Sequence, residues 1–148
     1  MRASRFAAYA ALTVSLACGG DGSGPSRTEF EGTWDATKLE FTNVANTSEK
    51  VEVIALGATY TIVLVSDGTY QATLGVPGSA PEVTTGTWSV SSDVITIKET
   101  GSSGDQQFNW SLSGNTLTIS GANTDFDFDG NGPRGDEAAK VSAVLVRQ

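Results

Sequence analysis

The fold is decided by residues 60–76, YTIVLVSDGTYQATLGV, in which two alternating runs flank an Asp67-Gly68 pair. Side chains along a β-strand point to opposite faces in turn, so each run predicts a strand with one buried face. Glycine supplies the positive φ that a tight turn needs, and Asp-Gly between two such runs therefore predicts a β-hairpin. The residues expected on the buried face are Tyr60, Ile62, Leu64, Tyr70, Ala72, Leu74 and Val76.

The same pattern continues from Phe30 to the end of the chain, and no stretch there shows a helical period. The last hairpin is expected to pair Phe126 and Phe128 with the run from Val141 to Leu145. We expect strands near residues 32–42, 58–66, 68–76, 83–91, 93–99, 106–113, 115–121, 124–129 and 139–147, with a short extra piece at 50–54.

Eight or nine strands joined by short hairpins predict an all-β protein. An antiparallel up-and-down β-barrel is the expected architecture, because closing the sheet removes the two edges that would otherwise pair with other chains. A two-sheet β-sandwich is the alternative, since periodicity alone does not separate the two.

Composition excludes several kinds of chemistry. The chain of 148 residues has no His and one Cys, so it has no Ser-His-Asp relay, no thiolate–imidazole pair and no disulfide within the chain. Carboxylates such as Asp35, Glu40 and Glu82 remain, but nothing in the sequence fixes their separation, and we expect no enzymatic activity. A formal charge of −8 argues against nucleic acid as a partner.

The first residues predict a targeting segment. Arg2 and Arg5 precede an uncharged run over residues 6–17, which is too short to span a bilayer. The sequence Ser15-Leu16-Ala17-Cys18 then resembles a bacterial lipoprotein signal, which implies cleavage before Cys18 and acylation of that cysteine. An ordinary secretory signal followed by a free cysteine is the alternative.

The resemblance to a lipoprotein signal implies three parts. Residues 1–17 are the signal peptide, residues 18–29 are the lipidated Cys18 with a Gly/Ser-rich tether, and residues 30–148 form the domain. Without the first 17 residues, seven basic and 17 acidic residues give a charge of −10, so the membrane contact is expected through lipid alone. Gly19 after the cysteine implies the bacterial outer membrane, facing the periplasm or the cell surface.

Five short motifs resemble the lipocalin-like domains of uncharacterised bacterial lipoproteins. They are Gly32-Thr33-Trp34, Asp67-Gly68-Thr69-Tyr70, Gly86-Thr87-Trp88-Ser89-Val90, the run from Leu112 to Ile119, and the terminal Leu145-Val146-Arg147. The resemblance implies a barrel whose floor is formed by Gly32, Trp34 and Arg147, with the arginine stacked on the indole by a cation–π contact.

The interior of such a barrel is either filled by side chains or wide enough for one small ligand. Tyr60, Tyr70 and Trp88 are the residues expected to touch a ligand, because they combine an apolar ring with a polar group. We therefore expect a carrier of a small hydrophobic molecule; a structural or protein-interaction module of the cell envelope with a filled barrel is the alternative. Further aromatic residues expected to point inward are Trp34, Phe108, Trp110, Phe126 and Phe128.

One segment offers a metal site as a second alternative, which would make the protein a calcium-binding envelope protein. Asp125, Asp127 and Asp129, with Asp136 eleven residues after Asp125, have the ligand spacing of a calcium loop. The competing interpretation is a strand that turns its two phenylalanines inward and its aspartates to solvent, and it is the one we favour.

Overall fold

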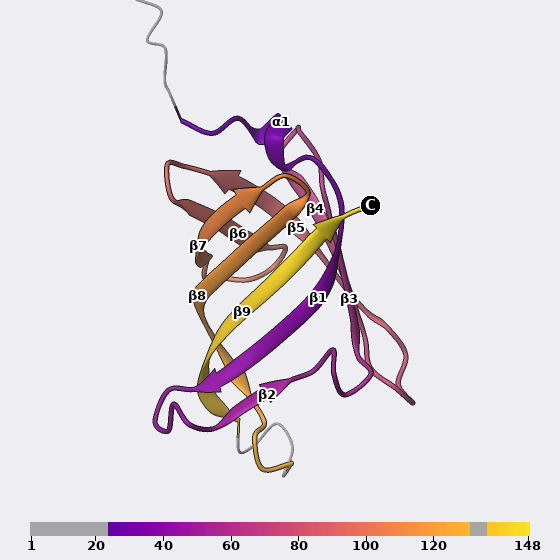
Figure 1. Ribbon diagram of the computed structural model, residues 1–148, viewed down its shortest axis with the longest axis vertical. Coiled ribbons are helices and arrows are strands. Elements are labelled where there is room, and N and C mark those ends of the chain that lie inside the picture. The colour runs from indigo at the N-terminus through magenta and orange to yellow at the C-terminus, as the bar shows by residue number, and fades with distance from the viewer. Residues whose placement is uncertain (1–23, 131–135) are drawn as a thin grey trace, which may run out of the picture.

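The computed structural model of the protein describes residues 24–130 and 136–148 (Figure 1). In these parts of the chain one short helix is followed by strands that lie in a single antiparallel sheet. The elements are α1 (Arg27–Phe30), β1 (Gly32–Asn43), β2 (Lys50–Glu52), β3 (Thr59–Leu64), β4 (Thr69–Gly75), β5 (Glu82–Val90), β6 (Val94–Glu99), β7 (Gln106–Ser113), β8 (Thr116–Phe126) and β9 (Glu137–Arg147).

The sheet closes into a barrel because β1 pairs with β9 as well as with β3. The β1–β9 pairing is long, from Trp34 opposite Arg147 to Asn43 opposite Ala139. Within the described residues, eight strands therefore form the closed wall, namely β1 and β3–β9, and β2 is an extra strand beside β1. The prediction of an up-and-down barrel is confirmed, and the sandwich alternative is wrong.

The two strands expected at 115–121 and 124–129 are a single strand, β8. Gly121, which has the sequence signature of a turn, instead forms a β-bulge: its φ is 97°, and the register shifts between Ser120 and Ala122. A bulge bends a strand without ending its pairing. The expected last hairpin is therefore wrong in register, because Phe126 pairs with Glu137 and Val141 pairs with Ala122.

On the side of β1 that faces β3, two different strands pair with it in turn. β3 pairs with β1 only over Gly32–Asp35, and β2 takes its place farther along, opposite Glu40 to Thr42. The carboxylate of Glu52 accepts hydrogen bonds from the backbone N–H groups of Leu39 at 2.9 Å, Ile54 at 3.1 Å and Ala55 at 2.7 Å. The Leu39 bond is the largest cause that lowers the pKa of Glu52. The hydrogen bonds of this one carboxylate thus join β2 and the turn after it to β1.

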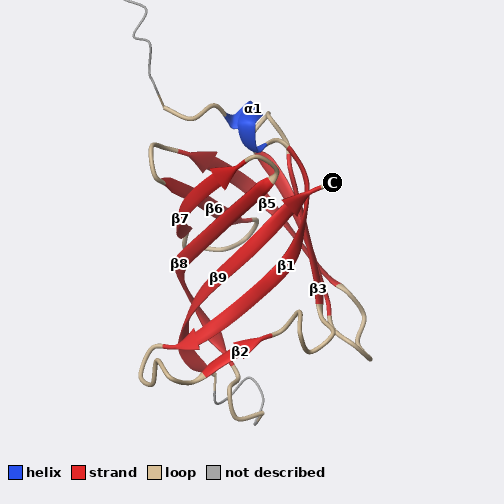
Figure 2. Cartoon of the chain, in the orientation of Figure 1, coloured by secondary structure: helices blue, strands red, loops and turns tan. Residues whose placement is uncertain are grey.

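The helix α1 covers one end of the barrel, where β1 begins and β9 ends (Figures 1 and 2). We call this the closed end and the opposite one, near β2, the open end. Ser26 caps the helix by accepting a hydrogen bond from the Thr28 N–H at 3.3 Å, and Phe30 is completely buried. The helix thus begins at Arg27, within the segment expected to be the tether and three residues before the predicted boundary at Phe30, whose apolar side chain packs into the core.

Over residues 24–130 and 136–148 there is no helix with the length and apolar character needed to cross a bilayer.

Candidate functional site

The barrel contains a cavity of about 320 Å³ that lies toward the open end. All eight barrel strands contribute to its lining, and most of the lining side chains are apolar. Ligand pockets in proteins range from about 300 to 1,000 Å³ and are mostly apolar with a few polar groups. The cavity is therefore large enough for one small molecule.

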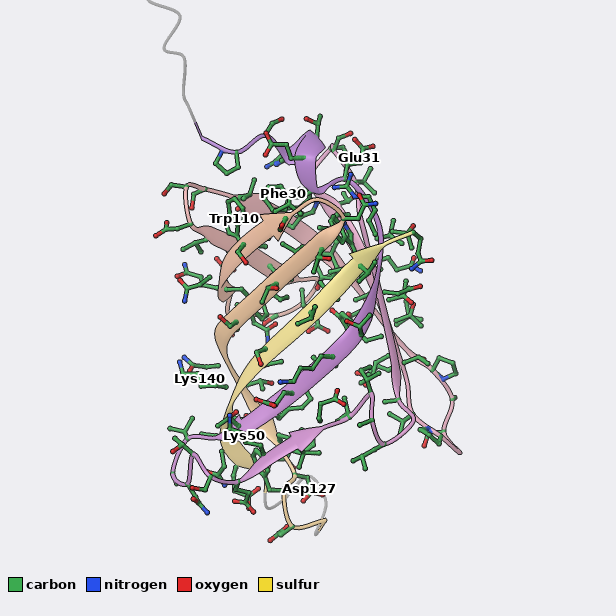
Figure 3. The ribbon with its side chains drawn as sticks, in the orientation of Figure 1. Phe30, Glu31, Lys50, Trp110, Asp127 and Lys140 are labelled. Atoms are coloured by element: carbon green, nitrogen blue, oxygen red, sulfur yellow. The ribbon has the colours of Figure 1, made fainter. Side chains whose placement is uncertain are left out.

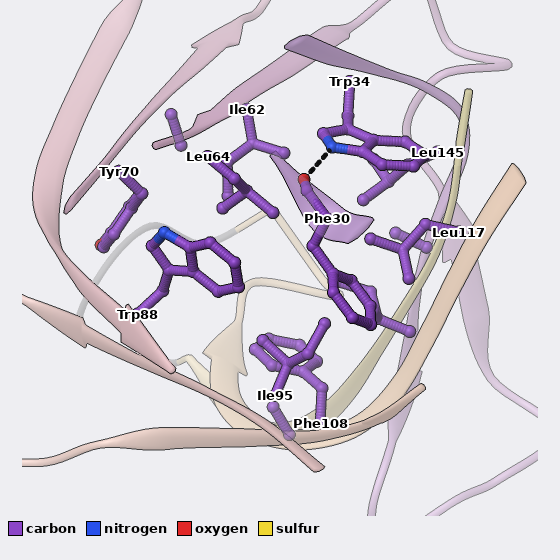
Figure 4. Packing of buried hydrophobic residues seen from close by; sticks show 14 of the residues in the cluster. Phe30, Trp34, Ile62, Leu64, Tyr70, Trp88, Ile95, Phe108, Leu117 and Leu145 are labelled. Atoms are coloured by element: carbon purple, nitrogen blue, oxygen red, sulfur yellow. Dashed lines mark hydrogen bonds between the residues drawn. The ribbon is translucent and has the colours of Figure 1, made fainter. Parts of the chain in front are cut away.

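The closed end of the barrel is filled by aromatic side chains, which form the floor below the cavity. Phe30 packs edge-to-face on Trp110, with ring centroids 4.8 Å apart and an interplanar angle of 89°, and lies 6.3 Å from Trp88. The indole N–H of Trp34 donates a hydrogen bond to the Phe30 carbonyl at 2.8 Å (Figure 4). No tryptophan of the chain lines the cavity, so intrinsic tryptophan fluorescence reports on the floor and not on the site.

The three residues expected to form the barrel floor lie together. The guanidinium carbon of Arg147 is 4.5 Å from the centroid of the Trp34 ring, and the same guanidinium donates a hydrogen bond to the Glu29 carbonyl. Gly32 has a φ of 132°, and a Cβ atom there would lie 3.7 Å from the Arg147 side chain. Gly32 thus adopts a backbone conformation that other residues rarely adopt, at the place where the Arg147 side chain packs against β1.

Trp88 belongs to this floor, contrary to the expectation that it touches a ligand. Its indole N–H donates a hydrogen bond to the Val65 carbonyl at 2.9 Å, and the guanidinium carbon of Arg27 lies 6.0 Å from its ring centroid. The two Gly-Thr-Trp motifs thus place Trp34 and Trp88 in similar settings, each under an arginine and each bonded to a backbone carbonyl. Trp88 faces inward as expected, but it lies too near the end of β5 to reach the cavity.

Tyr60 and Tyr70 line the cavity, where the sequence placed them. Burial raises the pKa of Tyr60 to about 12, with a smaller contribution from Tyr70. The pKa of Tyr70 is also raised, first by burial and then by the charge of Glu99, against a hydrogen bond with Thr84 that lowers it. Both phenols are therefore neutral at physiological pH and offer hydrogen-bonding groups inside an apolar wall.

The ring of Tyr70 takes its position from Gly86, its partner in the β4–β5 ladder. A Cβ atom on Gly86 would lie 2.9 Å from a ring carbon of Tyr70 and only 2.0 Å from the backbone carbonyl oxygen of Lys98. Gly86 thus lies within β5, as expected, at a place where two backbones and a ring approach closely.

Four polar residues at the open end of the cavity were missed as a group in the sequence, although Glu82 was noted among the carboxylates. Glu99 lies two positions after Ile97, and Gln106 lies two positions before Phe108, so the alternation that marks the apolar neighbours also places these polar residues inward. We call them the rim: Glu82, Thr84, Glu99 and Gln106.

Within the described residues, the aspartate segment begins as a β-strand. Asp125 lies in β8 opposite Ala138, and the Phe126 ring stacks on Phe41 with centroids 4.3 Å apart and 18° between the planes. Asp127 accepts a hydrogen bond from the Gly130 N–H at 2.7 Å. The stacked ring keeps Asp125 extended in the strand, whereas a calcium loop would have to curl it around an ion. In the part of the chain that the structure describes, no group of three or more carboxylates, the nearby Asp129 and Asp136 included, could hold a metal ion.

The expected signal peptide at 1–17 and the expected lipidation site Cys18 lie outside the described residues.

In a comparison with known protein families, a model described as a lipocalin-like domain matches residues 30–119. The matched region begins at the buried Phe30 and includes β1 through the first residues of β8. No curated protein matches the chain.

Proposed function

The chain belongs to the lipocalin-like domain family, and we propose that its barrel binds one small hydrophobic molecule in the cavity at the open end. The observation that carries this proposal is the cavity itself. A barrel that served only as a structural or protein-interaction module could be filled along its whole length, as this one is at the closed end. Here small side chains such as Ala72 and Ala143 face inward at the level of the cavity and leave the space open.

The proposed role is binding and not catalysis. The cavity walls are mainly aliphatic and aromatic, and its carboxylates Glu82 and Glu99 are exposed at the rim. Burial of an apolar ligand surface supplies the affinity, at roughly 25 cal/mol per Å² removed from water before the cost of immobilising the ligand.

A substitution that places a larger side chain in the cavity tests this proposal. We expect Ala72→Phe to weaken the binding of decanol by roughly tenfold or more, because Ala72 is 3% exposed and lines the cavity, so that the added ring takes up the ligand's space. Isothermal titration calorimetry measures the affinity, and thermal unfolding shows that the variant is folded. The matched control is Ala80→Phe at an exposed loop position, which should bind as the unaltered protein does. Equal binding by both variants would place the ligand elsewhere.

We further propose that the protein is a lipoprotein of the bacterial cell envelope, anchored through Cys18 and most consistent with the outer membrane, facing the periplasm or the cell surface. The support is the lipoprotein-like sequence up to Cys18 and the absence of apolar residues between Cys18 and Arg27. The chain reaches the barrel at the closed end, so an anchor before residue 24 would hold the barrel by the end opposite the cavity opening (Figure 1).

Lipidation is tested by replacing the acceptor. Cells that produce the full chain and are grown with a clickable palmitate analogue should label the protein, and Cys18→Ser should abolish both the label and membrane association. Equal labelling of the Cys18→Ser variant, or no label on either protein, would contradict the anchor.

A further inference from the structure

The charge around the cavity has a single sign. Two carboxylates, Glu82 and Glu99, are among its lining residues, and none of the described residues that line it is Lys or Arg. Lys98, the neighbour of Glu99, pairs with Asp105 at 4.0 Å and is not part of the lining. Neither glutamate therefore has a basic partner inside the cavity.

Other lysines at the open end already have partners on the protein. Lys38 and Lys50 both contact Glu40, at 2.9 and 3.3 Å, on the outside of the barrel near β2. Lys140 donates a hydrogen bond to the Gly121 carbonyl at 3.1 Å. The net formal charge of −8 adds to the negative potential at the rim.

Depth divides the cavity into an acidic part and an apolar part. Ile62, Ala72, Phe108 and Ile119 are buried, whereas Glu82 and Glu99 are exposed at the rim. Tyr60 and Tyr70 also line the wall, and as neutral phenols they offer hydrogen-bonding oxygens but no positive charge. A ligand that fits both parts has an apolar tail and a head that is positively charged.

We infer that the cavity takes a cationic amphiphile, such as a primary alkyl amine, with its ammonium group at the rim beside Glu82 and Glu99 and its chain in the apolar part. The inference rests on the proposed function and specifies its ligand class. An ammonium group at the rim is attracted by both carboxylates, while a fatty-acid carboxylate at the same place is repelled by both. The effect is electrostatic, so added salt weakens the preference.

Three ligands with the same chain and different heads test the inference: decylamine, decanol and decanoate, each titrated below its aggregation concentration at pH 7 by isothermal calorimetry. We expect decylamine to bind about tenfold more tightly than decanoate, a difference of about 1.4 kcal/mol, with decanol between them. Glu82→Gln with Glu99→Gln should reduce the amine-to-carboxylate ratio about fivefold or more, because it removes the attraction for decylamine and the repulsion of decanoate.

The matched control removes the same charge from the other end of the barrel. Glu29→Gln with Glu31→Gln alters two exposed carboxylates at the closed end, where Glu31 lies beside α1 (Figure 3), and should leave the ratio unchanged. An equal loss in both double variants would mean that net charge and not the rim selects the ligand, which overturns the inference.

The remaining outcomes separate this inference from the proposed function. If decanol binds in the cavity but decanoate binds as tightly as decylamine, the charge preference is wrong and the hydrophobic site stands. If none of the three ligands binds, the proposed function fails and the charge preference fails with it.

Discussion

Replacing Phe30 by alanine is expected to lower the free energy of unfolding by about 3–5 kcal/mol, the cost of removing a fully buried aromatic ring that leaves a cavity behind. Phe30 is 0% exposed, and its ring packs against those of Trp110 and Trp88. Its carbonyl also accepts the indole hydrogen bond of Trp34, so the residue joins α1 to the first strand. Urea denaturation followed by tryptophan fluorescence measures the loss, because the tryptophans lie around the substituted ring.

Phe30→Leu is the matched comparison, because leucine keeps most of the buried volume. It should lower the free energy of unfolding clearly less than the alanine variant does. A truncation at the exposed Val44 should change stability by no more than about 0.5 kcal/mol. A loss below about 1 kcal/mol for Phe30→Ala would show that α1 is a fraying terminus and that the floor does not depend on it.

The second large effect is expected at Gly86, where alanine should cost about 3 kcal/mol. The new Cβ atom would lie 2.0 Å from the Lys98 carbonyl oxygen, and this neighbour is backbone that cannot rotate away. β5 and β6 would have to separate locally, and the Tyr70 ring, 2.9 Å from the same Cβ, would move in the cavity wall. Decanol affinity should therefore fall together with stability.

Gly104→Ala is the matched control, because a Cβ atom at Gly104 meets nothing within 4 Å and its backbone is not in the left-handed region. Its stability should stay within about 0.5 kcal/mol of the unaltered protein. If Gly86→Ala were equally mild in denaturation experiments, the close approach of β5 and β6 at this residue would be wrong.

The barrel was predictable because the alternation in each strand is strong and the connections are short. Its details depended on interactions that alternation does not encode. Gly121 has the local signature of a turn, and only the continuous pairing of β8 with β9 shows that it is a bulge. The turn at α1 was missed because Phe30 is the only apolar residue in a polar segment, and its burial follows from the shape of the barrel end.

The site was predictable to a similar extent. Period-two alternation gives the face of a side chain within a strand, but not its height along the barrel axis, which depends on register. It was wrong for Val76, expected on the buried face, which is 48% exposed because β4 ends at Gly75. Tyr60 and Trp88 both point inward, yet Tyr60 lies in the cavity wall and Trp88 in the floor. Glu82 and Glu99 were not recognised as part of the site because charged residues are normally expected on the outer face of a strand.

Binding of a small molecule inside the barrel is tested most directly by isoleucine methyl NMR during a titration with decanol. The chain has five isoleucines, of which Ile62, Ile97 and Ile119 line the cavity while Ile54 and Ile95 do not. We predict that saturating decanol shifts the methyl signals of the three lining residues and leaves the other two in place. No shift at the three lining residues, or shifts confined to Ile54 and Ile95, would contradict a ligand site in the cavity.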